Sequence, residues 1–188
     1  MSQSYHFQSQ RVILRAFEPE DLSSLHTYLN HPDLLGRRYL PWGFPDDAPL
    51  SKKKLEAVLE KWGKEEDGFN LAVVLQDTQK VIGHAGCDWG WDLHCPDMTL
   101  VIDPVHQRQG YGSEVLHILL NYLYEQTPAH NVSVWMADWN HPARQFAEKY
   151  GFRECGQWRR AGLRGGAFFD MVQMDILRAE WLARKEVV

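Results

Sequence analysis

Cysteine is scarce in this chain of 188 residues, and the pattern of the few present argues against a disulfide-stabilised domain. Cys87, Cys95 and Cys155 form no CxxC pair and cannot all be bridged, so we expect reduced thiols in a reducing compartment. Long apolar runs are also missing, because no window approaches the ~18 apolar residues of a membrane span. The N-terminus has no basic segment followed by an apolar one. We therefore expect a cytoplasmic protein with no membrane partner.

Positive charge is also in short supply. The net charge is −5, and the lysine-rich run at residues 51–54 is interpreted as the solvated start of a helix. Because binding to a nucleic-acid backbone usually requires a basic domain or stripe, we expect no nucleic-acid partner. The chain does have 44% hydrophobic and 24% charged residues, with no internal repeat or linker. This composition predicts one globular domain over residues 1–188.

Apolar periodicity predicts the order of the secondary-structure elements. Strand patterns cover residues 11–17, 69–76, 80–92, 97–103, 131–138, 153–160 and 167–177, and helical spacing follows Pro19 and covers 51–62, 112–126, 140–150 and 178–186. Residues 31–50 contain four prolines and two glycines, which is typical of a long irregular loop that shapes a site. The order predicts an α/β domain with a mixed sheet.

The segment QRQGYG, residues 107–112, joins a predicted strand to a predicted helix. The first N–H groups of a helix have no partner within it, and together with the helix dipole they favour a phosphate group. A glycine inside a helix costs ~1 kcal/mol relative to alanine, so Gly110 and Gly112 call for a compensating use. No Lys-Ser/Thr follows as in a P-loop, and Val115 replaces the third glycine of the dinucleotide fingerprint. A tight turn without a ligand is the alternative.

Two longer stretches carry a family resemblance. VIDPVHQRQGYGSEVLHILL resembles the acetyl-CoA signature of the GNAT acetyltransferases, whose Q/R-x-x-G-x-G/A pattern is matched by residues 107–112. NHPARQFAEKYGF is similar to a second family motif and keeps six of its residues: Asn140, Phe146, Glu148, Lys149, Gly151 and Phe152. ILRAF near the start and LRAEW near the end resemble the branch containing the ribosomal-protein N-terminal acetyltransferases. The resemblance implies an α+β fold with a mixed, mostly antiparallel central sheet of about seven strands flanked by helices.

The resemblance also implies where acetyl-CoA binds. In the family, the strands matching 98–102 and 132–138 are parallel neighbours that splay apart, and the pantetheine arm lies between them. The resemblance implies that the backbone of Leu100, Val101 and Ile102 holds the pantetheine. The amides of Gln109, Gly110, Tyr111, Gly112 and Ser113 would hold the pyrophosphate, with added contacts from the side chains of Gln107 and Arg108. From the other side, Asn140 would reach the cofactor, and Ala143 and Phe146 would line its wall. For Arg108 the alternative is a solvated loop residue, and for Phe146 it is core packing.

Acetyl transfer requires a neutral amine, so a base is expected near the thioester. Deprotonating an α-amine of pKa ~8 at pH 7 costs about 1.4 kcal/mol, against roughly 4–5 kcal/mol for a lysine-like amine. Asp97 is the candidate catalytic base, because relatives often carry a glutamate at the start of this strand; a surface aspartate is the alternative. Asp88 and Asp92 are expected to share one strand face and to attract a cationic amine.

Two proton donors of the family are absent. Ala147 stands where many relatives have a tyrosine, and Ala143 stands where others have a serine. Tyr150 is three residues beyond position 147 and is expected in the core rather than at the thiolate. The main hypothesis is an acetyl-CoA-dependent N-acetyltransferase that forms a ternary complex, with a CoA-binding sensor or regulatory module as the alternative.

The acceptor is expected to be a primary amine, with a protein or peptide N-terminus ahead of a small amine. Its candidate contacts are aromatic: Tyr39, Trp42, Phe44, Trp89 and Trp91. A metal is not expected, because strand alternation puts His84 and Cys87 on opposite faces and the adjacent His94 and Cys95 rarely ligate together. The family resemblance makes a homodimer possible.

Overall fold

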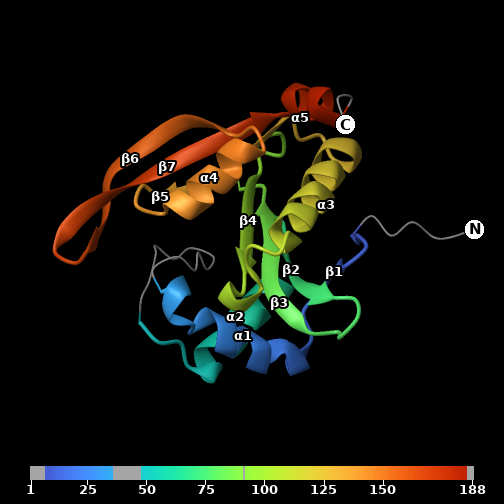
Figure 1. Cartoon of the computed structure of the whole chain (residues 1–188), viewed down its shortest axis with the longest axis vertical. Helices are drawn as coiled ribbons and strands as arrows, with labels where there is room; N and C mark the ends of the chain where they lie inside the picture. The colour runs from blue at the N-terminus through green and yellow to red at the C-terminus, as the bar shows by residue number, and fades with distance from the viewer. Residues whose placement is uncertain (1–6, 36–47, 91, 186–188) are drawn as a thin grey trace, which may run out of the picture.

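A computed structural model describes residues 7–35, 48–90 and 92–185 (Figure 1). Its centre is a seven-stranded sheet in the order β1-β2-β3-β4-β5-β7-β6. The strands are β1 Val12–Arg15, β2 Gly68–Leu75, β3 Val81–Asp88, β4 Asp97–Ile102, β5 Asn131–Ala137, β6 Arg153–Arg164 and β7 Ala167–Leu177; the helices are α1 Leu22–Leu29, α2 Lys52–Gly63, α3 Tyr111–Gln126, α4 His141–Lys149 and α5 Arg178–Lys185. The predicted fold class, a mixed and mostly antiparallel sheet flanked by helices, is confirmed.

The two faces of the sheet bury two different cores. Successive residues of a strand point to opposite faces, so Val73 and Leu75 join the core under α3, whereas Ala72 and Val74 join the core under α1 and α2. His84 and Cys87 are likewise divided between the two, as predicted. In the described part of the chain, no group of three or more His, Cys, Asp or Glu side chains could hold a metal ion.

β4 and β5 are parallel neighbours that separate almost at once. Both strands lie within the described residues, and their ladder has one registered pair, Asp97 with Ser133. On its other edge β4 pairs with β3 over its full length, from Asp97 to Ile102. The backbone groups of β4 that face β5 beyond Asp97 therefore have no strand to bond, which confirms the expected splay.

Three strands differ from their predicted ranges by two residues or more at one end. β3 ends at Asp88, and Gly90 adopts a positive φ of 49°, so the strand predicted to run to residue 92 is too long. β6 instead continues past residue 160 to Arg164, and Figure 1 shows the β6–β7 hairpin reaching away from the rest of the sheet. β1 is shorter than predicted, at Val12–Arg15. None of the described helices is long and apolar enough to cross a membrane.

Candidate active site

The turn that follows β4 is held by its own side chains. Asp103 is buried, and its carboxylate accepts a hydrogen bond from the Val105 N–H at 3.2 Å and faces the His106 ring at 3.0 Å. The side-chain amide of Gln107 donates to the carbonyl of Ile102 at 2.8 Å. The side-chain amide of Gln107, which was expected to contact pyrophosphate, therefore bonds the backbone at the end of β4.

The next residues turn the backbone so that several N–H groups face outward. Arg108 and Gly110 both adopt a positive φ, at 59° and 91°, and Gly110 is the N-cap of α3. Within the described residues, the N–H groups of residues 108–112 form no hydrogen bond. Such a run of unpaired amides, placed at the positive end of a helix dipole, is suited to an anion.

Glycine is required by the fold at only one of positions 110 and 112. A Cβ on Gly110 would lie 2.9 Å from Nη2 of Arg11, and its positive φ already disfavours a side chain. A Cβ on Gly112 would meet only ordinary contacts, 3.7 Å from the Phe146 ring and 3.8 Å from Ile102. The fold therefore requires glycine at position 110, but no contact within the described residues requires it at 112.

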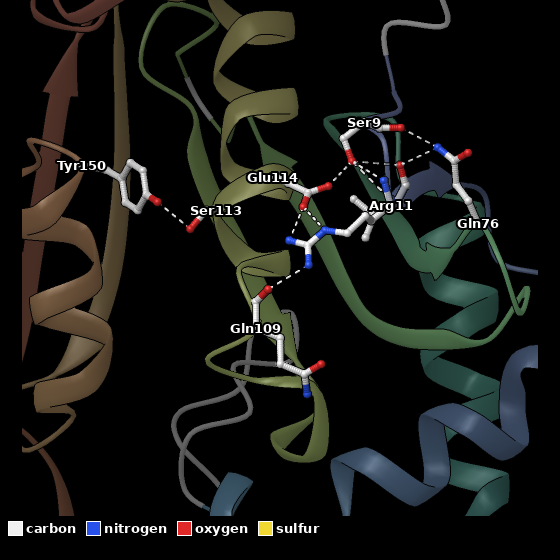
Figure 2. Close-up of polar contacts among 8 residues, drawn as sticks. Ser9, Arg11, Gln76, Gln109, Ser113, Glu114 and Tyr150 are labelled. Atoms are coloured by element: carbon white, nitrogen blue, oxygen red, sulfur yellow. Dashed lines mark hydrogen bonds and ion pairs between the residues drawn. The ribbon is translucent and has the colours of Figure 1, made fainter. Parts of the chain in front are cut away.

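Side chains from α4 line the other side of this turn. Phe146 is partly buried against the core, and its ring lies 5.0 Å from that of Tyr150. Figure 2 shows the Tyr150 hydroxyl, which donates to Oγ of Ser113 at 2.5 Å. Tyr150 is partly buried and packs against the core, as expected, while its hydroxyl reaches the first turn of α3.

Asn140 lies where β5 passes into α4. It is 5% exposed, and its side chain does not cap α4, although its carbonyl accepts hydrogen bonds from the N–H groups of Ala143 and Arg144. Ala143 is partly buried beside Phe146 in the core packing. Asn140 and Ala143 therefore lie at the β5 side of the splay, and Gly110 to Ser113 lie at the β4 side.

Asp97 lies at the point where the two strands meet. Its carboxylate is exposed, and Oδ1 accepts hydrogen bonds from the Ser133 hydroxyl and from Nε1 of Trp135, the latter at 3.0 Å. No donor among the described residues bonds Oδ2. Sequence reasoning missed Ser133 and Trp135, because the parallel register that brings them to Asp97 cannot be obtained from either strand alone.

The other two acidic residues are not placed as predicted. Asp88 is the register partner of Asp97 across β3 and β4, so these two carboxylates share one face. Asp92 lies beyond the end of the strand, where its carboxylate accepts from the His94 N–H at 2.8 Å. That hydrogen bond lowers the pKa of Asp92. The expected pairing of Asp88 and Asp92 on one strand face is therefore wrong, and Asp97 takes the place of Asp92.

Of the aromatic acceptor contacts, only Trp89 falls in the described part of the chain. It is partly buried and its ring lies 5.7 Å from Phe69, in the core packing under α3. Four others lie outside the described residues: Tyr39, Trp42, Phe44 and Trp91. The indole that does lie beside Asp97 is that of Trp135, which packs 5.3 Å from the ring of Trp158 on β6.

Comparison with known proteins identifies related sequences. The family model described as "Acetyltransferase (GNAT) domain" matches residues 11–153. The chain is 24% identical over 176 residues to YnaD of Bacillus subtilis (strain 168), named as an uncharacterized N-acetyltransferase, and the match covers 94% of this chain and 99% of that protein. It is 25% identical over 183 residues to YokL, a prophage-derived protein of the same organism and designation, covering 94% and 95%.

Solved structures share the fold. An acetyltransferase of the GNAT family from Bacillus anthracis has a TM-score of 0.77 at 22% identity, covering 93% of this chain and 99% of that one. A spermidine N-acetyltransferase from Vibrio cholerae, solved in complex with CoA and spermine, has the same TM-score, identity and coverage. These likenesses extend over the sheet and the helices that position the turn after β4.

Proposed function

The chain belongs to the GNAT family of N-acetyltransferases, and from that premise we propose that it transfers the acetyl group of acetyl-CoA to a protein or peptide N-terminus or a small primary amine. Gly112 is the observation that carries the cofactor assignment. It costs helix stability at a position where alanine would fit, and the compensating use is close approach of a pyrophosphate to the backbone.

The residues around the splay fit coenzyme A by their chemistry. The unpaired amides of residues 108–112 bind the pyrophosphate, and the Arg108 side chain adds positive charge. The edges of β4 and β5 bond the two amides of the pantetheine arm, as an added strand would. Asn140 and Phe146 close the β5 side. Acetyl-CoA, when bound, supplies an activated thioester.

Asp97 is the base of the proposed reaction. Two donors on Oδ1 fix the carboxylate, so Oδ2 accepts the proton of the incoming ammonium. The neutral amine nitrogen then attacks the acetyl carbon and the C–S bond breaks. The second N–H proton passes through water to the leaving thiolate, and Asp97 releases the first proton to solvent. A thiol of pKa ~8.5 leaves without a dedicated donor near neutral pH, so Ala143 and Ala147 do not prevent the reaction.

The acceptor is cationic before it is deprotonated, and the carboxylates of Asp88 and Asp97 on one face attract it. An α-amine suits a single carboxylate base, and the sequence resemblance to ribosomal-protein N-terminal acetyltransferases favours a protein N-terminus. The related V. cholerae structure binds spermine, which favours a small polyamine. Both acceptors carry a primary amine.

A CoA-binding sensor is the second candidate. It is favoured by the residues near the sulfur, because Ala147 is buried and neither it nor Ala143 carries a hydroxyl. The two functions share the cofactor site and differ in turnover.

The first experiment measures release of CoA thiol from acetyl-CoA with a panel of N-terminal peptides and polyamines, beside a calorimetric titration of CoA. We expect CoA binding and turnover on at least one class of amine. Binding without turnover on any acceptor would establish the sensor, and no binding would refute both candidates.

Asp97→Asn is expected to lower kcat by about 10²–10³-fold and to flatten the acidic limb of the pH–rate profile, with CoA affinity unchanged. Asp92→Asn is the matched control, because it removes a nearby carboxylate that lies off the strand. If both variants keep the wild-type profile, Asp97 is not the base.

A further inference from the structure

Arg11, the residue before β1, extends its side chain to the turn that is proposed to bind pyrophosphate. Its Nη1 donates to the carbonyl of Gln109 at 3.0 Å, and its Nε donates to the carboxylate of Glu114 at 2.6 Å (Figure 2). Its guanidinium also lies over the ring of Tyr111, 4.6 Å from the centroid. One side chain therefore contacts three residues of the turn and the first turn of α3.

The strand end that carries Arg11 is itself fixed. The Ser9 hydroxyl donates to the other oxygen of Glu114, and the side-chain amide of Gln76 on the neighbouring turn donates to the Ser9 carbonyl at 2.5 Å (Figure 2). Ser9 Oγ also accepts from the Val12 N–H at 3.1 Å. These bonds tie the β1 edge to the N-terminus of α3.

The contact with Gln109 sets the direction of an amide. In a trans peptide the C=O of one residue and the N–H of the next point in opposite directions, and this chain has no cis peptide among its described residues. Holding the Gln109 carbonyl toward Arg11 therefore turns the Gly110 N–H away from Arg11, to the side where the unpaired amides are presented.

The contact with Glu114 offsets a negative charge that would otherwise repel an anionic ligand. A carboxylate in the first turn stabilises the helix but repels an anionic ligand at the same end. Burial would raise the pKa of Glu114, yet hydrogen bonds from Ser9 and Arg11 outweigh it and hold the pKa below its usual value, so the carboxylate stays charged. The guanidinium neutralises that charge beside the turn.

We propose that Arg11 is a positioning residue for coenzyme A, which orients the Gly110 amide and screens Glu114 so that the turn after β4 accepts the diphosphate. This inference rests on the proposed function. It also places Nη2 of Arg11 next to the backbone at position 110, where a Cβ would lie 2.9 Å from it, although it is the positive φ that requires glycine there.

The test compares ligands with and without a diphosphate. CoA is titrated by calorimetry, and pantetheine, which lacks the nucleotide and the diphosphate, is titrated by ligand-detected NMR. Arg11→Ala is expected to weaken CoA about tenfold and to leave pantetheine unchanged, with Arg11→Lys between Arg11→Ala and the wild type. A purely structural role would weaken both ligands together.

Arg15→Ala is the matched control. Arg15 lies four residues beyond Arg11, as the last residue of β1, and bonds the Asp21 carboxylate at 2.7 and 2.9 Å, away from the turn. Its loss is expected to lower thermal stability without changing CoA affinity. Equal CoA affinities for the Arg11 and Arg15 variants would overturn the inference.

Glu114→Gln separates charge from packing, because it removes the carboxylate and leaves Arg11 with Gln109. We expect CoA affinity equal to or above that of the wild type, and partial recovery of affinity in Arg11→Ala/Glu114→Gln relative to Arg11→Ala. If Glu114→Gln weakens CoA as much as Arg11→Ala, screening is refuted. A wild-type chain that binds no CoA would refute the proposed function and this inference, whereas normal binding by Arg11→Ala would refute the inference alone.

Discussion

Burial strongly changes the chemistry of His84. It is fully buried between α1, α2 and β3, where the Tyr28 hydroxyl lies 2.9 Å from Nδ1 and the Trp62 ring lies 5.2 Å away. Desolvation lowers the pKa of His84 to about 3, so the ring is neutral in the folded protein at neutral pH. In the unfolded chain the pKa returns to ~6.5.

This difference predicts a pH-dependent stability. Between pH ~6.5 and ~3 the unfolded chain binds the proton and the folded chain does not, so stability is lost as pH falls, by up to about 1.4 kcal/mol per pH unit. His84→Asn is expected to be less stable at pH 7.5 but to lose stability less steeply in acid. Urea unfolding at pH 7.5, 5.5 and 4.5 measures both slopes. Burial raises the pKa of Asp21, but its hydrogen bonds with Arg15 and the Glu18 backbone outweigh this and lower it in both proteins, so its effect cancels in the comparison.

Equal slopes for the wild type and the variant would contradict the assignment of a neutral, buried imidazole. The position of His84 in a core was not apparent from its residue type. Strand alternation predicted that it faces away from Cys87, and the packing of α1 and α2 decided that this face is buried.

At the scale of elements, the two glycines in the turn between β4 and α3 look alike in sequence but meet different requirements. Gly110 is required by the backbone conformation, and Gly112 is required by the proposed CoA binding. Gly112→Ala is expected to keep or raise the free energy of unfolding, by up to about 1 kcal/mol, because alanine favours the helix and meets no close contact. It is also expected to weaken CoA about tenfold, because the Cβ holds the diphosphate away from the backbone. Urea unfolding and calorimetry measure the two effects.

Gly63→Ala is the control for helix propensity, since a Cβ there at the end of α2 has nothing within 4 Å. It is expected to leave CoA affinity unchanged. Gly110→Ala is expected to lower stability by about 1–2 kcal/mol, because of its positive φ and the approach of Arg11. Unchanged CoA affinity in Gly112→Ala would refute the use proposed for that glycine.

The order of elements was predictable, and the boundaries that failed have local causes. β3 was predicted four residues too long because the tryptophans on either side of Gly90 continue the alternation, while the positive φ at Gly90 ends the strand. β6 was predicted too short because its pairing with β7 shifts register between Trp158 and Gly162. A register shift breaks the period of two on which strand prediction depends.

At the scale of the whole molecule, ligand binding should close the gap in the sheet. A ligand at 100 times its Kd stabilises the fold by about 2.7 kcal/mol, which corresponds to an increase in Tm of roughly 5–10 °C for a chain of this size. We expect this shift with CoA, together with slower hydrogen exchange in β4 and β5. Adenosine monophosphate at equal ionic strength is the control, and a shift without protection of these strands would place CoA elsewhere.

The sequence by itself determined the elements, the family and the stretch that holds the cofactor motif, because local periodicity and glycine spacing are properties of neighbouring residues. The tertiary structure alone brought Arg11 to Gln109 and Glu114, and Ser133 and Trp135 to Asp97. It also showed that Asp97, and not Asp92, shares a face of the sheet with Asp88. These contacts join residues distant in the chain, and they depend on strand register and on the splay of β4 from β5, which no local pattern encodes.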